Sequence, residues 1–197
     1  MNLPNKITLA RIFFIPIFIL VFFLDSIPYN YLIAGLIYAV AACTDFIDGY
    51  IARSRGLVTN LGKFLDPIAD KVLVSTALIL LLTLEDTIFF FPKAANGLYI
   101  ATAVCVCIIM ARELIISAFR QIAASRGLVL AAEKLGKYKT IFQDIAVVIL
   151  IAVADFSGTF GKMIYIIGLI AFAIATVLTV WSGISYVVKN KQVLKDS

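Results

Sequence analysis

The sequence predicts an all-α integral membrane protein, a single domain over residues 1–197 with six transmembrane helices and both termini on the cytoplasmic side. Three observations support this fold class. Hydrophobic residues make up 62% of the chain, a share that no ordinary soluble domain reaches. Six long apolar stretches follow one another, separated by short polar segments. Six crossings would also gather 15 of the 17 Lys and Arg residues on one side.

The first three predicted spans cover about residues 6–24, 31–53 and, with an uncertain start at 60 or 66, up to 84. Pro16 predicts a kink in the first span. Lys6 and Arg11 ahead of an apolar run imitate a signal peptide, but no small-x-small cleavage site follows, so we expect a retained span. In the third span, Asp66 could be an N-cap with Pro67 at the first helical position, or Pro67 could kink a helix already begun.

The last three predicted spans cover about residues 97–124, 138–154 and 162–188. One side of the membrane would then hold the N-terminus, the 53–71 connection, the 112–139 stretch and the C-terminal tail, and only Lys93 and Lys162 would lie on the other. By the positive-inside rule the first side is cytoplasmic. Because the basic residues are spread over several short loops, anionic lipid headgroups explain the net charge of +5 better than nucleic acid does.

Four carboxylates fall within 26 residues of this apolar chain, at Asp45, Asp48, Asp66 and Asp70. The spacings i, i+3 and i, i+4 put each pair on one helix face, and the 53–62 interval allows a turn that brings the pairs together. Four unpaired aspartates deep in a membrane would cost on the order of 10 kcal/mol, so cations are expected. Oxygen ligands in a chain without histidine favour Mg²⁺, Mn²⁺ or Ca²⁺ over zinc.

Small residues accompany the carboxylates, at Gly49, Ala52 and Gly62. They leave room for a flat or bulky ligand to touch the backbone. Each of them alone would fit ordinary small-residue packing between membrane helices equally well. In combination with four aspartates, the ligand interpretation is favoured.

Four basic residues lie at the cytoplasmic ends of the fourth and fifth spans: Arg112, Arg120, Lys137 and Lys139. Each alone could snorkel to the interface as readily as bind a ligand. Together they predict an anionic ligand, most simply one with a phosphate. For Gln143 and Asp144, one turn into the fifth span, a buried hydrogen bond or a pair with Lys or Arg is favoured over a direct ligand role.

The pattern D-x-x-D-G-x-x-A-R-x8-G-x3-D-x3-D is matched at Asp45, Asp48, Gly49, Ala52, Arg53, Gly62, Asp66 and Asp70. It resembles the signature of the CDP-alcohol phosphatidyltransferases. The resemblance implies a six-helix, usually homodimeric membrane enzyme that uses two divalent ions, Mg²⁺ or Mn²⁺, to replace CMP in a CDP-linked lipid with an alcohol. The four aspartates would hold the metals, and Asp70 would also take the proton of the incoming hydroxyl, since a carboxylate is the natural base without histidine.

A narrower likeness extends over most of the chain. Residues 3–11, 111–113, 117, 120, 125–127 and 136–143 resemble the branch of this family that joins CDP-diacylglycerol to sn-glycerol 3-phosphate at the cytoplasmic face of the cell membrane. Asn5, Thr8, Arg11, Gly49, Ala52, Arg53 and Gly62 would then approach the donor. Arg112, Arg120, Lys137 and Lys139 would grip the acceptor phosphate.

Other interpretations remain open. The same chemistry could serve another acceptor, namely inositol phosphate, serine or phosphatidylglycerol. Paired aspartates would also suit a cation-coupled transporter, but such a site is expected near mid-membrane between repeated halves. An aspartate-rich prenyltransferase would carry its acidic motifs in two separated regions of a longer chain.

Overall fold

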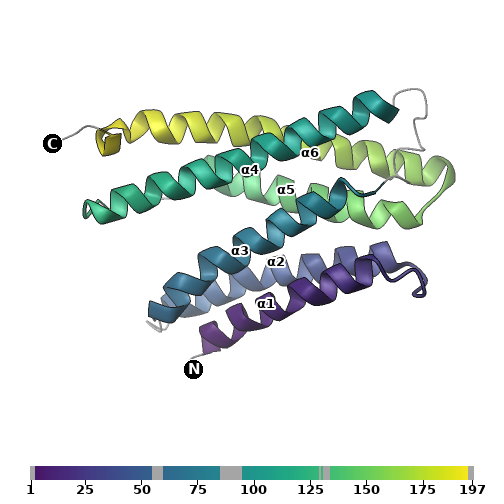
Figure 1. Cartoon of the computed structure of the whole chain (residues 1–197), viewed down its shortest axis with the longest axis horizontal. Coiled ribbons are helices and arrows are strands. Elements are labelled where there is room, and N and C mark those ends of the chain that lie inside the picture. Colours follow the sequence, from purple (N-terminus) through teal and green to yellow (C-terminus); the bar gives the residue numbers. More distant parts are fainter. Residues whose placement is uncertain (1–2, 55–59, 85–94, 129, 131–133, 195–197) are drawn as a thin grey trace.

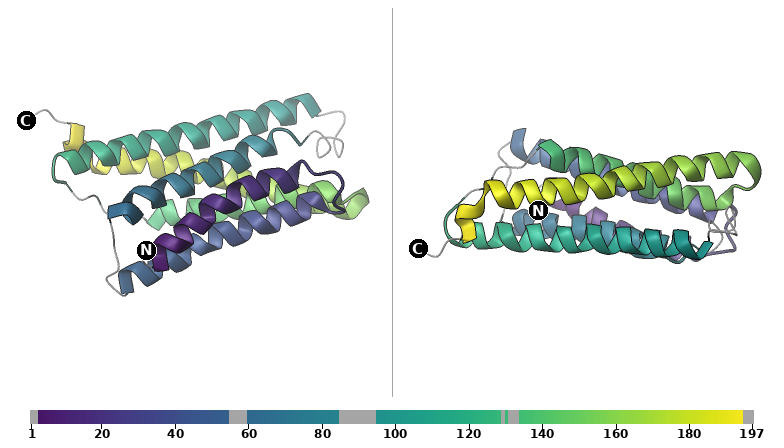
Figure 2. Two further views of the ribbon diagram at one scale, coloured as in Figure 1. Left: turned by 60° about the horizontal axis from the view of Figure 1, so that its bottom comes forward. Right: turned by 90° about the horizontal axis from the view of Figure 1, so that it is seen from above.

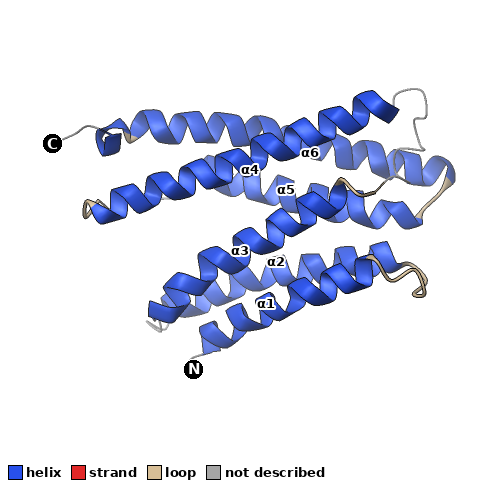
Figure 3. Cartoon of the chain, in the orientation of Figure 1, coloured by secondary structure: helices blue, strands red, loops and turns tan. Residues whose placement is uncertain are grey.

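The computed structural model describes residues 3–54, 60–84, 95–128, 130 and 134–194. Within these ranges, the description excludes the side chains of residues 3–6, 45–54, 60, 61, 63, 64, 66, 95, 134 and 194. The described residues form six α-helices and two short 3-10 helices, with no β-strand among them (Figure 3). The all-α class predicted from composition is confirmed.

The helices are α1 (Leu3–Phe22), α2 (Asn30–Ser54), α3 (Asn60–Leu81), α4 (Ala95–Ser125), α5 (Lys134–Ala152) and α6 (Gly158–Lys189), with η2 (Val153–Asp155) and η3 (Lys191–Leu194). Successive helices alternate in direction, so α1, α3 and α5 begin at the end of the bundle where α2, α4 and α6 finish (Figure 1). We call this the proximal end and the opposite one the distal end. Residues distant in sequence therefore meet at the proximal end.

The helices pack around one apolar core. Helix α5 contacts α6, α2 and α3, α1 packs on α2 and α3, and α4 lies against α6 (Figure 2). Five helices each contribute a large buried side chain to this core: Phe18, Tyr38, Leu73, Ile109 and Leu150. A smaller cluster around Phe119 and Tyr186 joins the proximal ends of α4 and α6.

The outward faces of the bundle are apolar as well. Exposed large hydrophobic residues include Phe13, Leu20, Ile100, Phe160 and Trp181. Two helical segments, Asn96–Ser125 and Gly158–Lys189, are long and apolar enough to cross a membrane by length and composition. An exterior of this kind suits contact with lipid hydrocarbon.

Helix boundaries differ from the predicted spans by a few residues. Helix α3 begins at Asn60, so Pro67 lies inside a helix already begun and Asp66 is not its N-cap. Helix α5 begins at Lys134 instead of near residue 138, because the polar first turn carries no apolar periodicity to mark it. Helix α4 ends at Ser125, and Gly127 just beyond it, with a φ of +72° and the Leu128 N to Ala123 O bond of 2.9 Å, forms a C-terminal glycine cap.

Two side chains at the distal end form hydrogen bonds with the backbone of other segments. Asn30 donates from Nδ2 to the carbonyl oxygen of Phe22 over 2.9 Å, which satisfies a free carbonyl at the end of α1. Asp155, in the turn before α6, accepts a hydrogen bond from the backbone N–H of Leu32 over 2.6 Å. The first turn of α2 is thereby bonded to the end of α1 and to the turn before α6.

Gly168 sets the close approach of α6 to α5. A Cβ atom at this position would lie 2.8 Å from Cδ2 of Leu150 and 3.0 Å from Cγ2 of Ile149. Gly168→Ala is therefore expected to lower the free energy of unfolding by about 1–3 kcal/mol through overpacking, measured by thermal unfolding in detergent micelles. The matched control is Gly97→Ala, where a Cβ meets nothing within 4 Å; equal stability of both variants would contradict the packing argument.

Candidate active site

The acidic motif is divided between α2 and α3. Asp45 and Asp48 lie in the second half of α2, and Asp66 and Asp70 in the first half of α3. Asp48 lies six residues before the end of α2 and Asp66 six residues after the start of α3, which corresponds to about 9 Å along each axis. Because α2 and α3 run antiparallel and pack on each other, both pairs lie at the same height near the proximal end.

Of the four aspartates, only Asp70 has a described side chain, and it is half-buried. The described residues contain no group of three or more His, Cys, Asp and Glu placed to hold a metal ion, but Asp45, Asp48 and Asp66 lie outside that description. The donor set itself consists of carboxylate oxygens, which suit Mg²⁺ or Mn²⁺. The residue types and helix positions therefore fit a divalent metal site.

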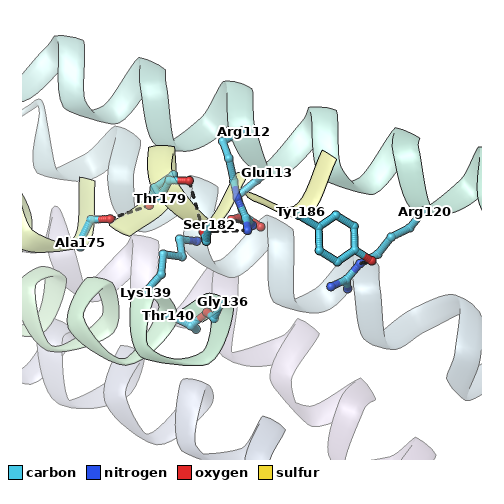
Figure 4. Close-up of polar contacts among 10 residues, drawn as sticks. All are labelled: Arg112, Glu113, Arg120, Gly136, Lys139, Thr140, Ala175, Thr179, Ser182 and Tyr186. Carbon is cyan, nitrogen blue, oxygen red and sulfur yellow. Dashed lines mark hydrogen bonds and ion pairs between the residues drawn. The ribbon is translucent and has the colours of Figure 1, made fainter. Parts of the chain in front are cut away.

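A compact ionic cluster joins α4 to α5 (Figure 4). The Oε1 atom of Glu113 accepts from Nζ of Lys139 over 2.5 Å and from Nη1 of Arg112 over 3.1 Å. Lys139 is only 3% exposed, so its charge depends on this carboxylate for compensation. Two of the predicted basic residues thus meet on one acid.

Arg112 is also held by α6. Its Nη2 donates to Oγ of Ser182 over 3.1 Å, and a Cβ on Gly183 would lie 3.1 Å from Cγ of Arg112. The Nε atom is buried and finds no hydrogen-bond partner among the described residues. The guanidinium group is therefore fixed in place with one donor unused.

The other two predicted basic residues lie outside the cluster. Arg120, eight residues further along α4, donates from Nε to the hydroxyl of Tyr186 over 3.1 Å, and its guanidinium carbon lies 5.2 Å from the centre of that ring. Figure 4 shows this pair beside the cluster, nearer the end of α4. Lys137 is exposed at the start of α5.

A cavity of about 30 Å³ between α3, α4 and α5 joins the acidic motif to the basic cluster. Its lining includes Asp70 from α3, Glu113 from α4, and Lys139, Thr140 and Gln143 from α5. A carboxylate able to take a proton and an ammonium group able to hold an anion therefore face the same small space. No periodicity in the sequence could have placed these two groups together.

The residues expected near the donor lie on the neighbouring helices. Thr8 and Arg11 of α1 are buried, and Arg11 Nε donates to Oγ1 of Thr44 over 3.4 Å, one position before Asp45 in α2. Gly62 is buried at the start of α3. The side-chain positions of Asn5, Gly49, Ala52 and Arg53 lie outside the described residues, although all four belong to α1 or α2.

Three polar residues near the site carry no signal that the sequence analysis used. The Tyr38 hydroxyl donates to Oδ1 of Asp144 over 2.8 Å, so Asp144 makes the expected hydrogen bond, although it is only half-buried. Gln143 differs from the expectation, because its buried Oε1 has no partner among the described residues. On α6, Ser182 accepts a hydrogen bond from Arg112, and Tyr186 accepts one from Arg120. Polar residues recurring along an otherwise apolar span were the available hint, at Thr176, Thr179, Ser182 and Tyr186.

Comparison with known proteins identifies the class to which this fold and this site belong. The chain matches the family model described as CDP-alcohol phosphatidyltransferase over residues 1–181. It therefore belongs to the CDP-alcohol phosphatidyltransferase family, which confirms the expectation drawn from the acidic motif.

Three similar proteins share the name CDP-diacylglycerol–glycerol-3-phosphate 3-phosphatidyltransferase. The protein of this name from Bacillus subtilis (strain 168) is 40% identical and covers 100% of this chain and 98% of its own length. The Rickettsia bellii protein is 38% identical over 94% of this chain and 93% of its own. The Haemophilus influenzae protein is 34% identical over 100% and 97%. The similarity thus extends over essentially the whole of each protein.

Proposed function

We propose that this protein transfers the phosphatidyl group of CDP-diacylglycerol to sn-glycerol 3-phosphate, releasing CMP and forming phosphatidylglycerol phosphate. The observation that carries the proposal is the cavity lined by both Asp70 and Lys139. An acceptor with a reactive hydroxyl at one end and a phosphate at the other needs a proton acceptor and a cation on opposite sides of one space. The shared name of the full-length relatives supports the same reaction.

The proposed step is a substitution at phosphorus. The primary hydroxyl oxygen of the acceptor attacks the phosphorus that carries diacylglycerol, and Asp70 takes the hydroxyl proton as the new O–P bond forms. The bond between that phosphorus and the oxygen of the CMP phosphate breaks, and CMP leaves with the electron pair. Atoms and charge balance without any further reactant.

The metal ligands would be Asp45, Asp48, Asp66 and Asp70. When bound, two Mg²⁺ or Mn²⁺ ions would neutralise the charge that develops on the attacked and leaving phosphates. The matched heights of the two pairs on α2 and α3 support this assignment. So does the need to offset four like charges in an apolar bundle.

The acceptor phosphate would bind Arg112 and Lys139. The unused, buried Nε of Arg112 supports an anionic partner, because buried donors are rarely left unpaired. Glu113 would hold both cations in position until the phosphate shares them. Lys137 would add attraction at the exposed mouth, and Arg120 would have to leave the Tyr186 ring to reach the phosphate.

The donor would lie along α1, α2 and α3. Asn5, Thr8, Arg11, Arg53 and the small residues Gly49, Ala52 and Gly62 would approach its nucleotide part. An apolar groove of about 350 Å³ between α2 and α5, with Ala39, Ala42 and Cys43 on one wall, ends two residues before Asp45. Its position suits an acyl chain that enters sideways from the lipid.

We place all six helices across the cell membrane, with both termini and the site at the cytoplasmic face. The alternating helix directions and the gathering of 15 of 17 basic residues on one side support this orientation. A soluble acceptor would then reach the site from the cytoplasm. We also expect a homodimer, as the family resemblance implies.

The test is CMP release by the purified chain in detergent micelles with Mg²⁺ or Mn²⁺ and CDP-diacylglycerol. We expect release with glycerol 3-phosphate and none above background with inositol phosphate, serine or phosphatidylglycerol. Excess EDTA should abolish it, and added metal should restore it. Release that persists under EDTA would contradict the metal site, and preference for another acceptor would contradict the acceptor assignment. Turnover in micelles, where no gradient exists, would exclude a cation-coupled transporter.

Gly183 offers a test of the Arg112 assignment away from the metals. Gly183→Leu should push the Arg112 side chain aside, because even a Cβ would lie 3.1 Å from its Cγ. We expect the KM for glycerol 3-phosphate to rise about tenfold, the value of one hydrogen bond to a charged group, with kcat nearly unchanged. Gly97→Leu, in open space on α4, is the control; an unchanged KM in Gly183→Leu would argue against Arg112 as a phosphate ligand.

A further inference from the structure

Gln143 carries a buried side-chain amide whose carbonyl oxygen has no hydrogen-bond partner in the described part of the protein. The residue is 1% exposed, and Oε1 accepts no hydrogen bond from any described residue. Its neighbour Asp144, by contrast, is bonded to Tyr38. Because buried polar atoms without a partner are rare in folded proteins, this oxygen points to a donor that the described residues do not supply.

The position of Gln143 relates it to both halves of the site. It lines the cavity that also holds Asp70, Glu113 and Lys139. Lys139 and Gln143 are four residues apart in α5, so they lie on the same face about 6 Å apart along the axis. The cation, the amide and, from α3, the carboxylate therefore surround one space.

These three groups correspond in kind to the three functional groups of glycerol 3-phosphate. Its phosphate is on C3, a hydroxyl that does not react is on C2, and the attacking hydroxyl is on C1. With the phosphate at Lys139 and the C1 hydroxyl at Asp70, the C2 hydroxyl falls between them. A neutral amide oxygen can accept a hydrogen bond from the C2 hydroxyl without repelling the phosphate. A third carboxylate beside Asp70 and Glu113 would repel it.

We propose that Oε1 of Gln143 accepts a hydrogen bond from the C2 hydroxyl, so that Gln143 selects glycerol 3-phosphate over phosphorylated alcohols without that hydroxyl. The inference rests on the function proposed above and assigns one specificity-determining residue within it. An acceptor that lacks the hydroxyl leaves the amide oxygen unpaired in the complex. Sites built to bond a substrate hydroxyl reject such analogues for that reason.

The test compares glycerol 3-phosphate with 3-hydroxypropyl phosphate, which differs only by lacking the C2 hydroxyl. CMP release gives the ratio of kcat/KM for the two acceptors. The natural chain should favour glycerol 3-phosphate by about tenfold or more. Gln143→Met, which keeps the length of the side chain but removes the amide, should bring the ratio close to 1, mainly through loss of activity on glycerol 3-phosphate.

Two further variants complete the design. Gln121→Met makes the same chemical change at an exposed position of α4, and its ratio should equal that of the natural chain. Gln143→Asn keeps an amide on a side chain one methylene shorter, and it serves as the second variant if Gln143→Met does not fold. Its ratio should lie between that of the natural chain and that expected for Gln143→Met. A purely structural role for Gln143 would lower the activity on both acceptors equally and leave the ratio unchanged.

Each result separates this inference from the proposed function. An active natural chain that uses both acceptors within twofold would overturn the role of Gln143 without any variant. An unchanged ratio in either Gln143 variant would do the same. No CMP release with either acceptor from the natural chain would instead refute the proposed function, and the Gln143 assignment would fall with it.

Discussion

Replacing any one of Asp45, Asp48, Asp66 or Asp70 with asparagine is expected to reduce CMP release by at least about 100-fold, the lower range for losing a positioned acid–base group. Each replacement removes one negative charge from the proposed metal site, and Asp70→Asn also removes the proposed base. The shapes of the side chains stay the same, so the fold should persist. The measurement is kcat at saturating CDP-diacylglycerol and glycerol 3-phosphate, together with thermal unfolding in micelles.

Asp25→Asn is the matched control, because Asp25 is exposed in the turn after α1 at the distal end. Its activity should equal that of the natural chain. Because all four residues are proposed metal ligands, each variant should also need a higher Mg²⁺ concentration to reach half of its maximal rate. Near-normal turnover in any one of the four aspartate variants would contradict the role proposed for that residue.

The second large effect is an asymmetry between the two partners of one ion pair. Glu113→Gln should lower the free energy of unfolding by about 3–5 kcal/mol, because it leaves the nearly buried ammonium group of Lys139 without a carboxylate. Lys139→Met should disturb the fold far less, since Glu113 is partly exposed and keeps Arg112 as a partner. Its main effect should be a KM for glycerol 3-phosphate raised by about tenfold or more.

A double-mutant cycle distinguishes this explanation from simple loss of packing. The Glu113→Gln, Lys139→Met double variant no longer contains the buried ammonium group, and Arg112 keeps its hydrogen bond to Ser182. The double variant should therefore recover most of the stability lost in Glu113→Gln. Its KM should stay high. Additive losses of stability in the double variant would show that the pair is not coupled as its 2.5 Å separation indicates.

The acidic motif could be predicted from sequence because its information is local. Two residue pairs at helical spacing, close together along the chain, define a face on each of two adjacent helices. The helices themselves could be predicted because long apolar runs mark them. Their ends could not, as the polar first turn of α5 illustrates.

The basic side of the site was harder to predict because it depends on which helices become neighbours. Arg112, Arg120, Lys137 and Lys139 look alike in the sequence, yet only Arg112 and Lys139 meet at Glu113. Arg120 lies about 12 Å further along α4 and meets Tyr186, a residue 66 positions away. Likewise, no local pattern distinguishes the bonded Asp144 from Gln143 with its unpaired oxygen.

The two ends of the bundle are fastened in different ways. At the distal end, the side chains of Asn30 and Asp155 bond to backbone atoms of neighbouring segments. Near the cavity, α4 is joined to α5 by the Lys139–Glu113 ion pair and to α6 by the Arg112–Ser182 hydrogen bond. Both links are between side chains, so an anionic ligand could replace Glu113 or Ser182 as the partner of the cation. A space of about 30 Å³ is far smaller than a phosphorylated glycerol, so the proposed acceptor would fit only if the helices separate there. The bundle would then open at its proximal end, where Glu113 releases its cations to the ligand. The distal end, where Asp155 is bonded to α2, would act as the hinge.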